Sequence, residues 1–269
     1  MALLEVNGIG KSFGATSVLR GISFDLAEGE ALAIIGSSGS GKTTLLRCLN
    51  FLERPDTGVI RVNGETMWDA ADPATQRESE IRKKRLHFGL VFQNFNLFPQ
   101  YTALQNVMLA GELLAKERPD YRANKKAVHA QLEQQARELL AQMGLSERAD
   151  HYPHQLSGGQ QQRVAIARML MQQAPIMVFD DSLSAVDAET DAKIRAALRD
   201  TLHSATVLLI SHRVTTLMQA DRILVLDGGR VSALGAHREL IDRPGIYRDI
   251  YDIQMRSDDR ALVEEGGNA

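Results

Sequence analysis

The sequence is poor in the residues that cross-link small secreted domains and in the long apolar runs that cross membranes. Cys48 is the only cysteine in 269 residues, so an intramolecular disulfide is excluded and a reducing compartment is expected. No apolar run approaches the ~20 residues that a transmembrane helix needs. The apolar segment at the N-terminus is too short for a signal peptide, because the charged residue Glu5 follows soon after Met1. If the chain serves a membrane process, we expect another chain to supply the pore.

Neither sign of charge dominates. The formal net charge is −3, which gives no bulk electrostatic case for binding nucleic acid. The basic run Arg82–Arg85 is local, and we expect it on a solvated face in front of a strand. The chain is long enough for one large domain with a sizeable core, or for a domain with a subdomain.

A glycine-rich loop stands between an apolar run and a helical stretch. The run Ala31–Ile35 has the length of a buried strand, and Thr44–Asn50 has the pattern of a helix. The loop residues are Gly36, Ser37, Ser38, Gly39, Ser40, Gly41, Lys42 and Thr43, with Thr44 next. Backbone N–H groups of such a loop wrap an anion, Lys42 can neutralise terminal phosphates, and Thr43 can offer its hydroxyl to Mg²⁺. The order strand, loop, helix favours a nucleotide site over a flexible Gly/Ser linker, because the helix dipole then faces the phosphates.

A second apolar run ends in a carboxylate. Pro175 ends a helical stretch, and Ile176–Phe179 leads directly to Asp180. A carboxylate at the carboxyl end of a parallel strand, beside a phosphate loop, can hold Mg²⁺ through water. We therefore expect Asp180 to belong to the same nucleotide site.

The segment Leu156–Gln160 reads Leu-Ser-Gly-Gly-Gln and continues into Gln161–Arg168. Together with the phosphate loop, it resembles the signature of the ATP-binding cassette (ABC) family, and nearly the whole chain is similar to that family. The resemblance implies an α/β fold: a P-loop NTPase core with a mostly parallel sheet, an N-terminal antiparallel β subdomain and an inserted helical subdomain. It also implies that two cassettes face each other and that the signature of one closes on the ATP of the other. The signature residues are Ser157, Gly158, Gly159 and Gln160.

The resemblance also assigns roles to single residues. Gln93 matches the Q-loop glutamine, His212 the switch histidine that contacts the γ-phosphate, and Phe13 the aromatic that stacks on adenine. For Phe13, a place in the core of an N-terminal strand stays open. Asp181 stands where the family usually has a glutamate that orients the attacking water, so reduced ATPase activity is one expectation. The implied catalytic residues are Lys42, Gln93, Asp181 and His212, and the implied metal ligands are Thr43, Gln93 and Asp180.

The coarse pattern predicts a core, an insertion and a tail. The ATP-binding core is expected over 1–92 and 166–250, the helical subdomain over 93–165, and a partly disordered tail over 251–269. The expected helices of the insertion cover 102–114 and 124–143. The expected strands include 3–6, 58–62, 206–209, 223–226 and 231–234, with hairpin turns at Asn63-Gly64 and 227–229.

The resemblance changes along the chain. Up to about Arg168 the chain is similar to ATPases of bacterial polar amino acid importers, as in Cys48–Glu53 and Val91–Pro99. From about Ile176 onward it is similar to exporter ATPase domains, as in Gly245–Tyr251. A mosaic of two subfamilies, of natural or artificial origin, and a divergent importer ATPase both fit this pattern.

The first hypothesis is an ATP-hydrolysing subunit that energises import of polar amino acids through a separate permease, because residues 87–115 are importer-like where the permease docks in the family. The alternatives are an exporter subunit with a slow site at Asp181, and a non-transport ABC ATPase acting in translation or DNA repair. The expected cofactors are ATP and Mg²⁺. The expected partners are a second cassette, in a homo- or heterodimer, the permease and, only indirectly, a solute-binding protein, with no nucleic acid. The expected place is the cytoplasmic face of the bacterial inner membrane, and the solute is expected to bind other chains.

Overall fold

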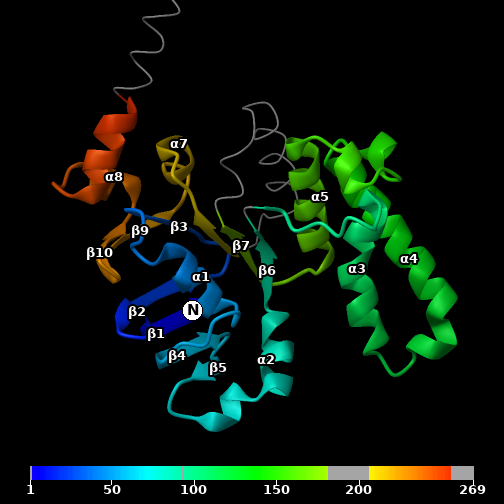
Figure 1. The fold of residues 1–269 in the computed structure, drawn as a ribbon, viewed down its shortest axis with the longest axis horizontal. Coiled ribbons are helices and arrows are strands. Elements are labelled where there is room, and N and C mark those ends of the chain that lie inside the picture. Colours follow the sequence, from blue (N-terminus) through cyan, green and yellow to red (C-terminus); the bar gives the residue numbers. More distant parts are fainter. Residues whose placement is uncertain (1, 93, 181–205, 256–269) are drawn as a thin grey trace, which may run out of the picture. The chain divides into compact units, whose positions relative to one another are not determined.

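The computed structural model describes residues 2–92, 94–180 and 206–255 (Figure 1). The chain divides into two compact units, one of Met1–Arg85 with Thr206–Ala269 and one of Leu86–Ala205. Each unit contains part of the residues to which the sequence assigns a function. The core, insertion and tail boundaries expected from the sequence stay a prediction.

The first unit contains an antiparallel sheet in the order β2-β1-β4-β5. Its strands are β1 (Ala2–Phe13), β2 (Thr16–Ala27), β4 (Thr57–Val62) and β5 (Glu65–Asp69). The β4–β5 turn uses Asn63 at φ 51° and Gly64 at φ 76°, the left-handed pair that a tight hairpin requires. The predicted hairpin is therefore confirmed, whereas β1 is longer than the predicted strand over 3–6 and β2 was not predicted.

Parallel strands of the first unit surround β3. Strand β3 (Ala31–Gly36) pairs in parallel with β8 (Thr206–Ile210) and β9 (Arg222–Asp227), and β10 (Arg230–Gly235) joins β9 antiparallel. The interior of β3, from Leu32 to Ile35, is at most 1% exposed. This burial on both faces explains why the strand reads as an unbroken apolar run.

Besides the short η1 (Pro73–Gln76), four labelled helices lie in the described part of the first unit. They are α1 (Lys42–Leu49), α2 (Glu78–Arg85), α7 (Val214–Leu217) and α8 (His237–Ile241). A further helical stretch covers residues 246–255, five residues into the predicted tail, and 256–269 lie outside the described residues.

The prediction of a wholly solvated basic run is wrong for one residue of α2. Arg82 and Lys83 are exposed, but Lys84 is 8% exposed and its Nζ donates to the Thr75 carbonyl at 3.4 Å. Lys84 lies three residues after buried Ile81, so the helical period places both on the inner face. Cys48, on α1, is fully buried, and burial raises the pKa of its thiol to about 12.

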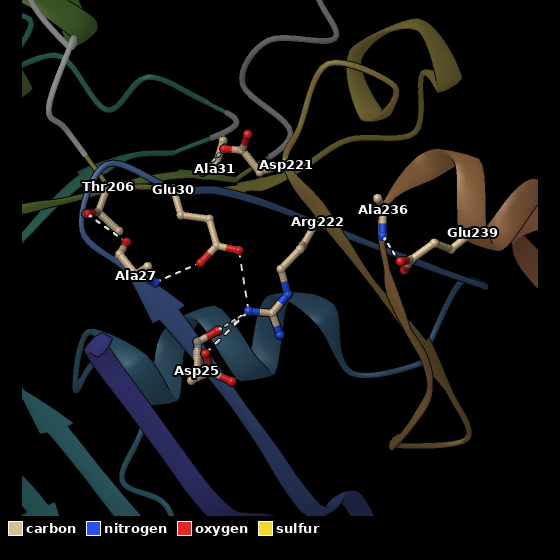
Figure 2. A network of polar contacts seen from close by, with 9 residues as sticks. All are labelled: Asp25, Ala27, Glu30, Ala31, Thr206, Asp221, Arg222, Ala236 and Glu239. Carbon is tan, nitrogen blue, oxygen red and sulfur yellow. Dashed lines mark hydrogen bonds and ion pairs between the residues drawn. The ribbon is translucent and has the colours of Figure 1, made fainter. Parts of the chain in front are cut away.

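A network of polar contacts fixes the amino end of β3 (Figure 2). The Arg222 guanidinium lies 3.3 Å from carboxylate oxygens of both Asp25 and Glu30. The second oxygen of Glu30 accepts from the Ala27 N–H at 2.7 Å. Asp221 accepts from the N–H of Ala31 at 2.8 Å. Because these contacts join β2, β3 and β9, they hold the strand that leads to the glycine-rich loop.

The described residues of the second unit, up to Asp180, combine a parallel strand pair with three long helices. Strands β6 (Phe88–Val91) and β7 (Ile176–Asp180) pair in parallel, and the helices are α3 (Ala103–Lys116), α4 (Tyr121–Gln142) and α5 (Gly158–Met171), with short turns η2 (Ser146–Arg148) and η3 (Pro153–Gln155). A Cβ on Gly111 of α3 would lie 2.7 Å from Leu132 of α4 and 3.0 Å from Met171 of α5. The three helices therefore meet closely at this glycine, and the predicted helices 102–114 and 124–143 are confirmed.

Within the described ranges, none of the helices has both the length and the apolar character of a membrane span.

Candidate nucleotide site

The glycine-rich loop follows β3 and packs tightly against its surroundings. A Cβ on Gly36 would overlap the Leu226 carbonyl oxygen and lie 2.7 Å from the Ser40 hydroxyl. Gly41 has φ 99°, and its Cβ would lie 2.8 Å from Leu19. Both positions therefore require glycine, one for close approach and the other for backbone conformation as well. In between, Ser37, Ser38 and Gly39 are exposed.

The Lys42 side chain is hydrogen-bonded to the backbone of the glycine-rich loop. Its Nζ donates to the carbonyls of Gly36 at 2.8 Å and Ser37 at 2.9 Å, and the residue is 8% exposed. These carbonyls keep the ammonium beside the exposed loop segment instead of in bulk solvent. The charge is thus positioned in advance for an anion at the loop.

Helix α1 begins without a side-chain cap. The first N–H groups of any α-helix have no intrahelical acceptor, and Gly41 at the N-cap offers no side-chain acceptor. The Ser40 hydroxyl is buried and has no hydrogen-bond partner within the described residues. A phosphate at this terminus would supply acceptors and match the positive end of the helix dipole. Thr43, in the first turn, is exposed and available to a cation that accompanies the phosphate.

The strand register brings His212 to the same edge of the sheet as the loop. In the parallel pair β3–β8, Ile34 lies opposite Ile210. Gly36 and His212 each follow two residues later, at the carboxyl ends of these strands. His212 is exposed. The predicted phosphate loop and the predicted switch histidine are therefore neighbours in one unit.

Phe13 lies at the end of β1 and is 47% exposed. The Lys11 ammonium lies 5.2 Å from the centre of its ring. The alternative that Phe13 belongs to the core is therefore wrong. Its predicted stacking on adenine stays a prediction.

The predicted metal ligand Asp180 is the last residue of β7 in the second unit and is half-buried. The register of β6 and β7 pairs Val91 with Phe179, so both strands end at the same edge. Gln93 and Asp181, the next predicted residues after these strand ends, lie outside the described residues.

The signature segment forms the N-terminus of α5. Ser157 is the N-cap: its hydroxyl accepts from the Gln160 N–H at 3.3 Å, and the Gln160 side chain accepts from the Ser157 N–H at 2.9 Å. This reciprocal capping box fixes the segment without a ligand. Ser157 and Gly158 are exposed, and Gly159 and Gln160 are half-exposed.

Two polar residues that the sequence did not single out hold the loop before α3. Asn106 is fully buried; its amide accepts from the Phe98 N–H at 2.8 Å and donates to the Phe98 and Tyr101 carbonyls at 3.1 Å. Arg168 donates at 2.8 Å to the carbonyls of Phe95 and Asn96, and burial lowers the pKa of its guanidinium. For Asn106, the sequence feature that could have indicated this role is an amide side chain within the apolar helix Ala103–Lys116.

The strand, the close-packed glycine loop and the uncapped helix define a phosphate-binding loop, which places the chain in the class of P-loop nucleotide-binding proteins. A sequence profile described as "ABC transporter" matches residues 19–184. The chain belongs to the ABC transporter family, and its fold is the mixed α/β fold of the family's ATP-hydrolysing cassette.

Named relatives are similar over most of their length. The chain is 41% identical over 246 residues to the L-cystine transport system ATP-binding protein TcyN of Escherichia coli (strain K12), covering 91% of this chain and 94% of the relative. It is also 41% identical over 248 residues to the glutamine transport ATP-binding protein GlnQ of the same organism, covering 91% and 96%.

Solved structures agree with this assignment. A dimeric post-hydrolysis state of the ATP-binding cassette MJ0796, bound to ADP and Pi, has a TM-score of 0.73 at 32% identity and covers 87% of this chain and 98% of that one. A bacterial Atm1-family ABC exporter with ATP bound has a TM-score of 0.77 at 27% identity, covering 93% of this chain and 41% of that one.

Proposed function

We propose that this chain hydrolyses ATP to energise import of polar amino acids through a separate membrane permease. The observation that carries the proposal is similarity over about nine-tenths of the chain to ATP-binding subunits named for cystine and glutamine transport. The predicted mosaic with an exporter-like C-terminal part stays a prediction. An exporter subunit remains the second transport hypothesis for that reason.

The loop residues fit the phosphates of ATP. Lys42 would neutralise phosphate charge, the N-terminus of α1 has no side-chain cap, and Gly36 and Gly41 allow the backbone to stay close. Phe13, exposed at the end of β1, would stack on the adenine ring. In this proposal His212 and Asp181 handle the attacking water and the developing charge. Most of the catalysis is then positioning and electrostatics.

The donor set also fits Mg²⁺. Hydroxyl, amide and carboxylate oxygens are the ligands that this cation prefers, and Thr43 and Asp180 offer two of them, one exposed and one half-buried. Thr43, Gln93 and Asp180 would hold the ion, which neutralises phosphate charge when bound. Chelation with excess EDTA should then abolish hydrolysis, measured as phosphate release, and added Mg²⁺ should restore it. Undiminished hydrolysis in EDTA would contradict this assignment.

A second cassette is proposed as the partner that completes the site. The Ser157 hydroxyl accepts a hydrogen bond from Gln160 but keeps its own hydrogen to donate, and it lies exposed at a helix N-terminus. A γ-phosphate held by the facing cassette would use that donor and the dipole of α5. The named solved cassettes include dimers.

Light scattering tests this assembly. A His212→Ala variant, slowed in hydrolysis, should form dimers in saturating MgATP, whereas the same variant with Lys42→Ala should stay monomeric. A strict monomer for His212→Ala at saturating nucleotide would contradict dimerisation by the chain alone.

The permease is proposed to dock at the segment before α3. Phe98 is 42% exposed, although its backbone is held on both sides by buried Asn106. An exposed aromatic on a rigid backbone is suited to anchor a partner. Docking there would place the chain at the cytoplasmic face of the bacterial inner membrane.

Affinity purification from solubilised membranes, followed by mass spectrometry, separates the alternatives. We expect an importer permease to copurify, and Phe98→Ala to reduce its yield severalfold, whereas Leu113→Ala, on an exposed face of α3, should not. Recovery of an exporter membrane domain would favour the second transport hypothesis. Recovery of ribosomes or repair proteins would overturn transport.

A further inference from the structure

The helical stretch 246–255, red in Figure 1, sends one side chain to the backbone around His212. Gln254 Nε2 donates to the His212 carbonyl at 2.5 Å, and Gln254 Oε1 accepts from the Val214 N–H at 2.9 Å. One amide group thus satisfies an acceptor and a donor on either side of Arg213. The partners are separated by about 40 residues in the sequence, so the contact is tertiary.

The segment that carries His212 has little regular structure of its own. It follows β8 and precedes α7, a helix of only four residues whose N-cap makes no side-chain hydrogen bond. The Ser211 hydroxyl accepts from the Arg213 N–H at 3.1 Å. With Gln254 added, side chains hold the backbone of three consecutive residues, 212 to 214.

The helix that carries Gln254 is itself anchored. Tyr247 is 3% exposed, and its hydroxyl lies 2.6 Å from Nδ1 of His237 on α8. Burial raises the pKa of this phenol to about 12, so it stays neutral at physiological pH. Arg248 donates to the Ile241 carbonyl at 2.8 Å. Gln254 is therefore presented by a fixed element, as a group that aligns another residue must be.

We propose that Gln254 is a positioning residue for His212: by fixing the peptide groups on both sides of Arg213, it aims the histidine at the nucleotide. The inference rests on the proposed role of His212 in hydrolysis. Misplacing a catalytic group by about 1 Å can cost on the order of a hundredfold in rate, so holding its backbone matters for turnover. The nucleotide itself is bound by the loop at Gly36–Thr43, so ATP affinity should not depend on Gln254.

The test replaces Gln254 by Met, which keeps the length and apolar packing but makes neither hydrogen bond. Asp249→Asn is the matched control, because Asp249 lies exposed on the same helix. We expect Gln254→Met to lower kcat for ATP hydrolysis by roughly tenfold while the Kd for ATP changes less than twofold. The control should match the parent in kcat, Kd and melting temperature.

A double variant separates positioning from general stabilisation. On a His212→Ala background, Gln254→Met should lower kcat by less than about twofold further, because the residue through which it acts is gone. Equal losses on both backgrounds would overturn the proposal, and so would a kcat within twofold of the parent for Gln254→Met alone. If His212→Ala itself leaves kcat unchanged, the assigned role of His212 fails instead.

Hydrogen exchange gives a readout that needs no turnover. In Gln254→Met the amide of Val214 loses its acceptor, so a peptide covering 211–217 should exchange several times faster than in the parent and in Asp249→Asn. Peptides from α1 should exchange at the parent rate. Unchanged exchange over 211–217 would show that the bond to Val214 does not hold this segment, and the proposal would be wrong.

Discussion

Helices α1 and α5 both begin at glycine-rich segments, but their N-termini are completed in opposite ways. At α1, Gly41 supplies no cap and the buried hydroxyl of Ser40 has no hydrogen-bond partner within the described residues. At α5, Ser157 and Gln160 cap each other reciprocally. The first terminus has no side-chain cap, whereas the second is capped by its own side chains.

The difference fits the proposed roles, in which one chain holds one nucleotide and takes part in binding another. A terminus without a side-chain cap gains most from a phosphate, so α1 should provide the binding energy. A capped terminus is ordered in advance and offers the remaining Ser157 hydrogen, the N–H groups that the capping box does not use, and the helix dipole. The second terminus should therefore contribute to closure and hydrolysis more than to the first binding event.

The largest effect is expected at α1. Lys42→Ala removes the charge held against the Gly36 and Ser37 carbonyls, so ATP affinity should fall by at least about a hundredfold, since charge-assisted contacts to phosphate are the strong ones. Calorimetry with MgATP measures it. Arg47→Ala, exposed in the last turn of the same helix, should bind like the parent. Equal ATP affinity in Lys42→Ala and the parent would show that the N-terminus of α1 does not provide the binding energy for ATP.

The second prediction separates two roles of Ser157, as the N-cap of α5 and as a hydrogen-bond donor to phosphate. Ser157→Ala loses both, so stability should fall by about 1 kcal/mol and hydrolysis by roughly tenfold or more. Ser157→Asp keeps an N-cap acceptor but has no hydrogen to donate and repels phosphate. It should keep the parent's stability and lose hydrolysis. ATP affinity of the single cassette should stay within about twofold for both.

Urea unfolding and phosphate release measure the two effects separately. If Ser157→Asp hydrolyses ATP as fast as the parent, the hydroxyl is no donor in the closed site. If either substitution weakens ATP binding as strongly as Lys42→Ala, the two termini are not different in the way that their capping suggests.

Much of this comparison could be predicted from the sequence because both segments depend on local chemistry. A strand followed by glycines and a lysine, and a serine three residues before a glutamine, specify their structures within a few positions. The β4–β5 hairpin followed from Asn63-Gly64 in the same way. Strand β2 was missed although its second half, Ile22–Leu26, alternates apolar and polar residues; Gly21 interrupts the pattern that precedes it.

The residues that hold the loops could not be predicted in this way. Asn106, Arg168 and Gln254 act by bonding to backbone groups, which are the same in every residue and leave no pattern in the sequence. Arg168 reaches carbonyls 72 and 73 positions away. Burial of Lys84 likewise depended on the face that α2 turns inward. Tertiary context, not propensity, decided each case.

The third prediction changes the chemistry while leaving both helix termini intact. Asp181 lies outside the described residues and directly follows Asp180 in the sequence. Aspartate and glutamate differ by only about 0.4 in pKa, but aspartate is shorter by one methylene, and about 1 Å at a catalytic group can be costly. Asp181→Glu should therefore raise ATP turnover at least severalfold with little change in nucleotide affinity. Steady-state phosphate release decides it, and a variant no faster than the parent would show that reach is not limiting.

The smallest effect is expected at the far end of the strand that leads to α1. Arg222→Met breaks the contacts to Asp25 and Glu30 at the amino end of β3 (Figure 2). Arg222 is 27% exposed and Asp25 61%, so solvent screens the pairs and the free energy of unfolding should fall by about 1 kcal/mol or less. Lys83→Met, which removes an i,i+3 pair at a 73% exposed side chain, should cost under about 0.5 kcal/mol. ATP affinity should be unchanged in both, because tight packing at Gly36 and Gly41 fixes the loop locally. A tenfold loss of ATP affinity in Arg222→Met would instead show that the open terminus of α1 depends on the whole length of β3.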